Sequence, residues 1–238
     1  LYLIEDSTEA LGSRYHGQTV GSFGDVALFD FSSPSALCCG EGGMLVTDDQ
    51  SLAHELRYLR QRRLSDSRSV SLGSRVPLQA GMSEISAALA LAQLAGLDDR
   101  LQERQQVVSW YHEQMQSFEG IKPPYWGDDV EEVHWMLYVV HLGKRFTGSA
   151  RTQMIDDLLA CGIETAAYSR PLHQQFFYMN EDETIGRKRG LLPDTDRIGD
   201  RALALPLHTQ LDYEQVKYIV KTLKDAATNV GAGAAIYL

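Results

Sequence analysis

The sequence is poor in cysteine and in positive charge. Its three cysteines are Cys38, Cys39 and Cys161, and no two of them have the C-x-x-C spacing of a structural zinc site. An odd count without that spacing also argues against a disulfide framework, so we expect a reducing, cytoplasmic setting and no metal site. The 22 basic and 32 acidic residues leave a net charge of −10. The clustered cations that nucleic-acid binding requires are therefore lacking, and we expect no nucleic-acid partner.

Long apolar runs are also missing. The longest, from Ala87 to Leu97, is interrupted by Gln93 and Gly96 and is too short to cross a bilayer, so we expect no membrane partner. The chain opens on Leu-Tyr-Leu-Ile, without a methionine or a basic leader segment. This opening predicts a buried strand. Because a start inside a strand is unusual, we expect the C-terminal part of a longer protein.

The pattern that is present favours a globular α/β protein in its first half. Hydrophobic residues make up 44% of the chain and charged residues 23%, which suits one large domain or two modest ones. Apolar strands are predicted at 1–4, 26–31 and 43–47, and helices around 52–59, at 83–97 and at 98–118. We expect the Ala-rich helix at 83–97 to be buried on nearly all sides, and residues 64–82 to form a long loop.

A second, α+β pattern follows Gly120. Strands are predicted at 135–142, 163–168 and 203–207, helices at 149–160 and 212–227, a polar loop at 179–200 and a frayed tail at 231–235. We therefore place the boundary between two domains near residue 118, with one domain at 1–118 and a second at 119–238.

Carboxylates follow the first predicted strand, in the run Glu5-Asp6-Ser7-Thr8-Glu9. A carboxylate at the C-terminal edge of a sheet is placed for ligand contact in α/β folds. The alternative is structural: Asp6 or Ser7 begins a helix as its N-cap, with Glu9 in the first turn. Spacing alone leaves both readings open and favours the structural one.

Two glycine-rich segments come next. Gly21-Ser22-Phe23-Gly24-Asp25 precedes a strand but lacks a P-loop lysine and the Rossmann glycine pattern. The segment from Phe31 to Gly43 is a polar loop that ends in Gly-Glu-Gly-Gly. Its serines and backbone amides can cradle an anion, although a connection between two strands needs no ligand.

In their order and spacing these motifs resemble the DegT/StrS family of nucleotide-sugar aminotransferases, pyridoxal-phosphate (PLP) enzymes of fold type I. The matching segments run from residue 1 to about 225 and include 4–6, 10–12, 21–25, 40–43, 47–49, 82–85, 162–165, 171–173 and 205–208. The resemblance implies a partial large PLP-binding domain at 1–118 without the family's N-terminal segment, and a small α+β domain at 119–238. It also implies amino transfer from glutamate to a keto group of a nucleotide-linked sugar.

The resemblance assigns four positions to the cofactor. Asp6 takes the place of the partner of the PLP ring nitrogen, and Glu9 stands beside the ring oxygen. Asp30 replaces a serine that bonds the phosphate, and Ser35 replaces the lysine that forms the Schiff base. No lysine precedes Lys122, and a serine hydroxyl cannot form an imine, so we predict no catalytic residue.

His173, in Pro171-Leu172-His173, is implied to contact the sugar, and a packed or surface histidine is the alternative. The arginines between 57 and 63 predict a helix surface that faces either solvent or another subunit. The second alternative is supported by the resemblance, because active sites in the family lie between two subunits. Three hypotheses follow. The first is a truncated, catalytically impaired family member, with a homodimer as its assembly. The others are a non-catalytic partner in a heterodimer with an active homologue and a nucleotide-sugar-binding module.

Overall fold

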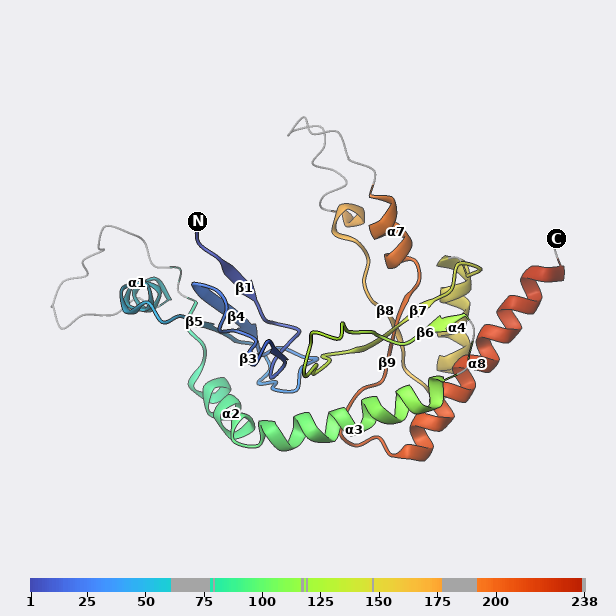
Figure 1. Cartoon of the computed structure of the whole chain (residues 1–238), viewed down its shortest axis with the longest axis horizontal. Helices are drawn as coiled ribbons and strands as arrows, with labels where there is room; N and C mark the ends of the chain where they lie inside the picture. Colours follow the sequence, from blue (N-terminus) through green and yellow to red (C-terminus); the bar gives the residue numbers. More distant parts are fainter. Residues whose placement is uncertain are drawn as a thin grey trace. The chain divides into compact units, whose positions relative to one another are not determined.

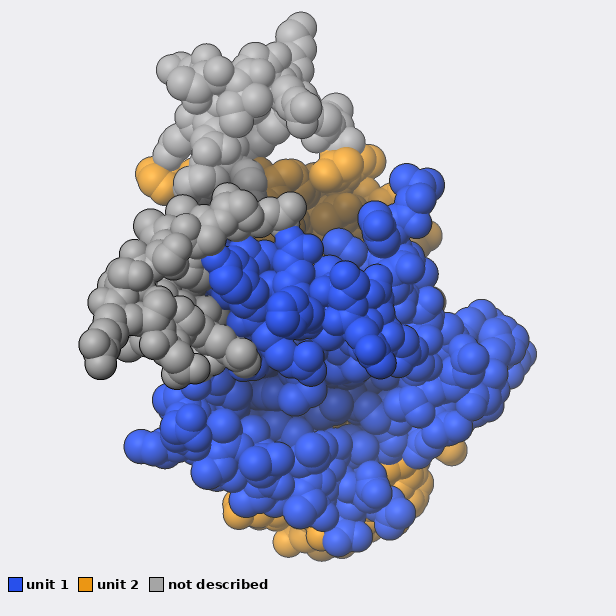
Figure 2. All heavy atoms as spheres, turned by 90° about the vertical axis from the view of Figure 1, so that its left-hand side faces the viewer, with its two compact units in different colours: residues 1–102, 126–136 blue, residues 103–125, 137–238 orange. Residues whose placement is uncertain are grey.

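The computed structural model describes residues 1–60, 78, 80–116, 118, 120–146, 148–176 and 192–236, the last five without their side chains. The chain forms two compact units (Figures 1 and 2). Unit 1 comprises residues 1–102 and 126–136, and unit 2 comprises residues 103–125 and 137–238. The division falls inside helix α3 (Leu97–Met115). The domains 1–118 and 119–238 inferred from the family resemblance stay a prediction.

Unit 1 is built on a three-stranded sheet in the order β1-β4-β5 (Figure 1). Its strands are β1 (Ile4–Asp6), β4 (Val26–Asp30) and β5 (Gly43–Val46). β1 and β4 are parallel and β4 and β5 antiparallel. The connection from β1 to β4 contains a short hairpin of β2 (Arg14–Tyr15) and β3 (Gln18–Thr19). The strands predicted at 26–31 and 43–47 are confirmed. The first strand spans Ile4–Asp6 and shares only Ile4 with the predicted range 1–4, and the apolar residues 1–4 are exposed rather than buried.

Helices α1 (Gln50–Arg60) and α2 (Glu84–Leu94) follow the sheet in sequence. The Ser83 hydroxyl caps α2 by accepting a hydrogen bond of 3.0 Å from the backbone N–H of Ser86. The expectation that α2 is buried on nearly all sides is wrong, because none of its residues is buried. Ala90 packs against the unit 1 core, whereas the large apolar side chains Ile85, Leu89, Leu91 and Leu94 are exposed.

Unit 2 contains a four-stranded antiparallel sheet in the order β6-β7-β9-β8. Its strands are β6 (Ile121–Lys122), β7 (Tyr138–Leu142), β8 (Ala166–Ala167) and β9 (Ala202–Leu205). Its helices are α4 (Gly148–Ala160), the 3-10 turn η1 (Leu172–Gln174), α7 (Pro193–Gly199) and α8 (Tyr213–Ile236). Among the described residues, no helix combines the length and the apolar character that a bilayer span needs.

Two expectations for unit 2 need correction. Residues 193–199 of the predicted loop 179–200 form α7, which begins with Pro193 at a position where a missing N–H costs nothing. The tail at 231–235 continues α8 instead of fraying, since alanine has the highest helix propensity. Residues 177–191, and residues 61–77 and 79 of the predicted loop 64–82, lie outside the described residues.

Candidate functional site

Asp6 and Asp30 end the parallel strands β1 and β4 on the same face of the sheet. Asp6 lies opposite Leu28, two residues before Asp30, so both side chains project to the same side. The Asp6 carboxylate accepts hydrogen bonds from the Thr8 hydroxyl (2.7 Å) and the Thr8 backbone N–H (3.2 Å). Turns rather than a helix follow β1, so the helix-cap alternative is wrong: Asp6 stabilises a local turn at the sheet edge. Glu9 lies exposed beyond this turn.

Glu5 organises the neighbouring glycine-rich turn. Its carboxylate accepts hydrogen bonds from the backbone N–H groups of Gly21 (2.6 Å), Phe23 (2.9 Å) and Gly24 (3.3 Å). Gly21 has a φ of +98°, and a β-carbon there would lie 2.4 Å from the Phe29 ring, so only glycine fits. Burial alone raises the pKa of Glu5, but these backbone donors outweigh it and lower the pKa below its ordinary value. The sequence motif therefore has a structural explanation.

Asp30 is bound by the residue that follows β4. Its carboxylate accepts hydrogen bonds from the Ser32 hydroxyl (2.5 Å) and the Ser32 backbone N–H (2.9 Å). These hydrogen bonds hold the pKa of Asp30 below its ordinary value, so the carboxyl is ionised at neutral pH. The Ser32 and Asp30 side chains thus hydrogen-bond to each other, at the position where the family resemblance implies a contact with the cofactor phosphate.

Ser35 lies half-buried in the loop between β4 and β5. Its hydroxyl accepts a hydrogen bond of 3.3 Å from the backbone N–H of Leu37, which is buried in the unit 1 core. Side chains of α2 and α3 hold the same loop by hydrogen bonds to its backbone. The Gln93 side-chain oxygen accepts from the Cys38 backbone N–H at 3.0 Å, and Arg100 Nε donates to the Ala36 carbonyl at 3.1 Å. The loop geometry is therefore set by α2 and α3.

The Gly-Glu-Gly-Gly turn closes this loop. Gly42 has a φ of +154°, and a β-carbon there would lie 2.9 Å from the terminal methyl of Met82. The buried Cys39 packs in the same core as Phe31 and Leu97. Cys38, Cys39 and Cys161 are all free thiols. In the described part of the chain, no group of three His, Cys, Asp or Glu residues is placed to hold a metal ion.

His173 lies in η1 of unit 2, where its ring nitrogen Nε2 is 2.6 Å from Oδ1 of Asp196. The same oxygen accepts a hydrogen bond of 2.5 Å from the side-chain amide of Gln174. Asp196 on α7 therefore joins the histidine to a second element of the unit. The contact between His173 and a sugar stays a prediction.

The sequence assigns no individual role to Glu5, Gln93, Arg100 or Asp196. Glu5 belongs to the carboxylate run that follows the first strand, but alternation along the strand puts Glu5 and Asp6 on opposite faces, so the two have different partners. The other three lie 23 to 64 residues from their partners, and no local spacing signals such pairs.

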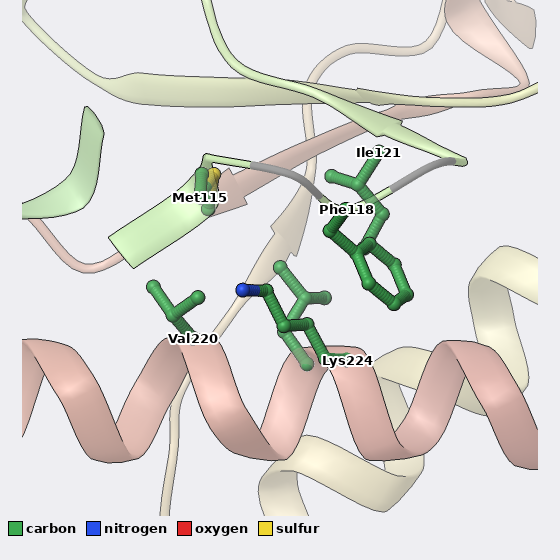
Figure 3. A pocket seen from close by; sticks show the side chains of 6 residues that line it. Met115, Phe118, Ile121, Val220 and Lys224 are labelled. Carbon is green, nitrogen blue, oxygen red and sulfur yellow. The ribbon is translucent and has the colours of Figure 1, made fainter. Parts of the chain in front are cut away.

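A separate apolar hollow in unit 2 is lined from α3, β6 and α8 (Figure 3). Its lining residues are Met115, Phe118, Ile121, Val220, Leu223 and Lys224. The ammonium of Lys224 donates to the Gln114 carbonyl at 2.6 Å and lies 5.7 Å from the centre of the Phe118 ring. The hollow is too small to hold a water molecule, so it is a packing feature of unit 2.

A sequence profile of the DegT/DnrJ/EryC1/StrS aminotransferase family matches residues 1–224. The chain belongs to this family. It is 32% identical over 226 residues to GDP-perosamine synthase from Caulobacter vibrioides, a match that spans 94% of this chain and 58% of that protein. The chain thus spans about three fifths of the length of the curated relatives it matches.

Solved structures show that this DegT-family chain has the fold of the PLP aminotransferases of fold type I. The PLP form of the putative sugar aminotransferase Spr1654 from Streptococcus pneumoniae matches with a TM-score of 0.84 and 27% identity, over 96% of this chain and 58% of that one. DesI, solved in the presence of its TDP-sugar product, matches with a TM-score of 0.82 and 27% identity, over 100% and 58%. PLP is therefore the cofactor that the family implies.

Proposed function

We propose that this chain is a catalytically impaired member of the sugar aminotransferase family, which does not itself transfer amino groups. The observation that carries the proposal is Ser35. The family places a lysine there, and Ser35 has only a hydroxyl, which accepts the Leu37 N–H. A hydroxyl has neither the amine needed for a Schiff base nor a pKa suited to moving protons near pH 7.

The residues present do not fit PLP. A serine is expected at position 30 to bond the phosphate, but Asp30 is ionised there and holds the Ser32 hydroxyl in its own hydrogen bond. Two unit charges ~4 Å apart repel by roughly 4 kcal/mol at an effective dielectric constant of ~20, and by less where solvent screens them. Asp6 keeps the residue type that pairs with a ring nitrogen. One retained contact does not offset the loss of the covalent link and the repulsion of the phosphate.

The test compares the purified chain with its Ser35→Lys variant, using Ser35→Ala as the control for loop disturbance. Each protein is incubated with PLP, freed of unbound cofactor, and scanned for the absorbance of retained cofactor. We expect no retention by any of the three. Transamination of a nucleotide-linked keto sugar by the unaltered chain, above a control without protein, would overturn the proposal.

A non-catalytic role beside an active homologue is the second candidate, and the outward-facing apolar residues of α2 favour it. Such a chain works in a heterodimer in the cytoplasm, consistent with its three free thiols. The third candidate is a module that binds a nucleotide-linked sugar without turnover, by analogy with DesI. Calorimetry with TDP- and GDP-linked sugars distinguishes them, because only the third requires saturable binding by this chain alone.

A further inference from the structure

The hydrogen-bond donors of the two residues that follow β4 are taken up within the chain. The Ser32 backbone N–H donates to Oδ1 of Asp30 at 2.9 Å, and the Ser32 hydroxyl donates to Oδ2 at 2.5 Å. The backbone N–H of Phe31 donates to the Gly42 carbonyl at 2.9 Å. Each oxygen of the Asp30 carboxylate therefore holds one donor of Ser32, and an anion that approached this turn would have to displace the carboxylate.

No positive side chain balances the charge at this edge of the sheet within the described chain. Asp30 is ionised at neutral pH because Ser32 lowers its pKa, and Asp6 ends the neighbouring parallel strand on the same face (Figure 1). In the described residues, no lysine, arginine or histidine nitrogen lies within 4.0 Å of either carboxylate. Protein sites that bind anions combine free N–H donors with positive potential. This edge has the opposite character, since its donors are used and its side chains are acidic.

Asp30 and Ser35 therefore depart from the family pattern with different effects. Ser35 lacks an amine, which removes a covalent link but repels nothing. Asp30 holds, with its own negative charge, the donors that an incoming anion needs. We propose that Asp30 is an internal anion that excludes phosphate-bearing ligands from this edge, independently of Ser35. The inference rests on the proposed function, because only the family resemblance implies a phosphate contact at position 30.

Contacts other than those of Asp30 hold the loop that follows β4. The Cys39 backbone N–H donates to the Phe31 carbonyl at 2.9 Å, and the Phe31 side chain is buried in the unit 1 core. Gln93 and Arg100 hold the loop further along through hydrogen bonds to its backbone. Replacement of Asp30 by serine is therefore expected to leave the loop folded and to release the two donors that the carboxylate holds.

The test is the affinity for inorganic phosphate, measured by phosphorus NMR titration of the full chain and of matched variants. Asp30→Ser removes the charge and frees the donors of Ser32. Asp49→Ser removes an equal charge at the start of α1, where Asp49 accepts hydrogen bonds from the N–H groups of Ser51 and Leu52 and where serine is also a good helix cap. We expect Asp30→Ser to bind phosphate roughly tenfold more tightly than the unaltered chain, because repulsion is removed and donors are gained. Asp49→Ser is expected to bind it as the unaltered chain does.

A second variant covers the case in which Asp30→Ser loses its cooperative unfolding transition. Asp30→Asn removes the charge, keeps the shape of the side chain and leaves an oxygen that can accept from Ser32. We expect it to bind phosphate roughly threefold more tightly than the unaltered chain, since only the repulsion is removed. A gain by the folded Asp30 variants no larger than that of Asp49→Ser would overturn the inference.

Retention of PLP gives an independent measurement. After removal of unbound cofactor, the Asp30→Ser/Ser35→Lys double variant is expected to keep the absorbance of PLP, and Ser35→Lys alone is not. Equal retention by these two proteins would overturn the inference, because Asp30 would then make no difference. Transamination by the unaltered chain would contradict the proposed function instead, so the two failures are distinguishable.

Discussion

The Glu5 carboxylate accepts a 2.6 Å hydrogen bond from the backbone N–H of Gly21, sixteen residues later in the chain. Together with the N–H groups of Phe23 and Gly24, this contact makes the acidic side chain the organiser of the turn that precedes β4. The folded state lowers the pKa of Glu5 below its ordinary value of 4.5. The stabilisation is therefore present above about pH 4.5 and is lost as the pH falls through the folded-state pKa.

We predict that Glu5→Gln destabilises unit 1 by about 1–2 kcal/mol at pH 7 and by less at pH 3, because only the charged form makes strong acceptor contacts. Urea unfolding from pH 3 to pH 7, followed by circular dichroism, measures the difference. Glu164→Gln, an exposed change in unit 2, serves as the control. An equal loss at both pH values would contradict the role of the charge.

The loop around Ser35 is predicted to loosen when its two anchors are removed. Gln93→Ala leaves the Cys38 N–H without its acceptor, and Arg100→Ala removes the donor to the Ala36 carbonyl. Each substitution is expected to cost ~1 kcal/mol and to speed exchange of the Cys38 amide. Hydrogen exchange read by mass spectrometry checks this, with Gln102→Ala as the exposed control. Unchanged exchange at residues 36–39 would show that the loop is held in another way.

The core of unit 2 is predicted to weaken in alkali. Tyr111 stacks on Tyr138 with ring centres 4.5 Å apart, and its hydroxyl donates to the Pro206 carbonyl at 2.8 Å. Burial raises the pKa of Tyr111 above its ordinary value of 10.0, so the unfolded chain loses this proton first. Stability should fall above about pH 10, and less steeply in Tyr111→Phe, which costs ~1 kcal/mol at pH 7. Urea unfolding from pH 8 to pH 11 measures both effects, against Tyr125→Phe on the surface.

Asp196 is predicted to hold η1 against α7. Asp196→Ala removes the acceptor for both His173 and Gln174 and is expected to open this part of unit 2 to proteases at least several-fold faster. Asp194→Ala is the matched control, since its ion pair with Arg197 is exposed and such pairs contribute at most ~1 kcal/mol. Limited proteolysis followed by mass spectrometry distinguishes the two. Similar cleavage rates would mean that Asp196 does not join these elements.

The sequence allowed the family and the order of elements to be predicted, because glycine turns and apolar periods are local signals. The strands at 26–31 and 43–47 show this, and the family match confirms the fold. The sequence was misleading for α2. Its apolar composition indicates that these side chains favour burial, but it does not show whether this chain buries them. The partners of the site residues were not predictable, because Gln93 and Asp196 act across long stretches of chain.

The order of strands in unit 2 has a consequence for synthesis on the ribosome. β9 (Ala202–Leu205) lies between β7 and β8 and pairs with both, although it is the last strand of the sheet to be made. Until about residue 205 has left the exit tunnel, β7 and β8 have no strand to join them, and their apolar faces are open to other chains. A chaperone that binds nascent chains should therefore engage this protein late in translation and release it only after β9 emerges.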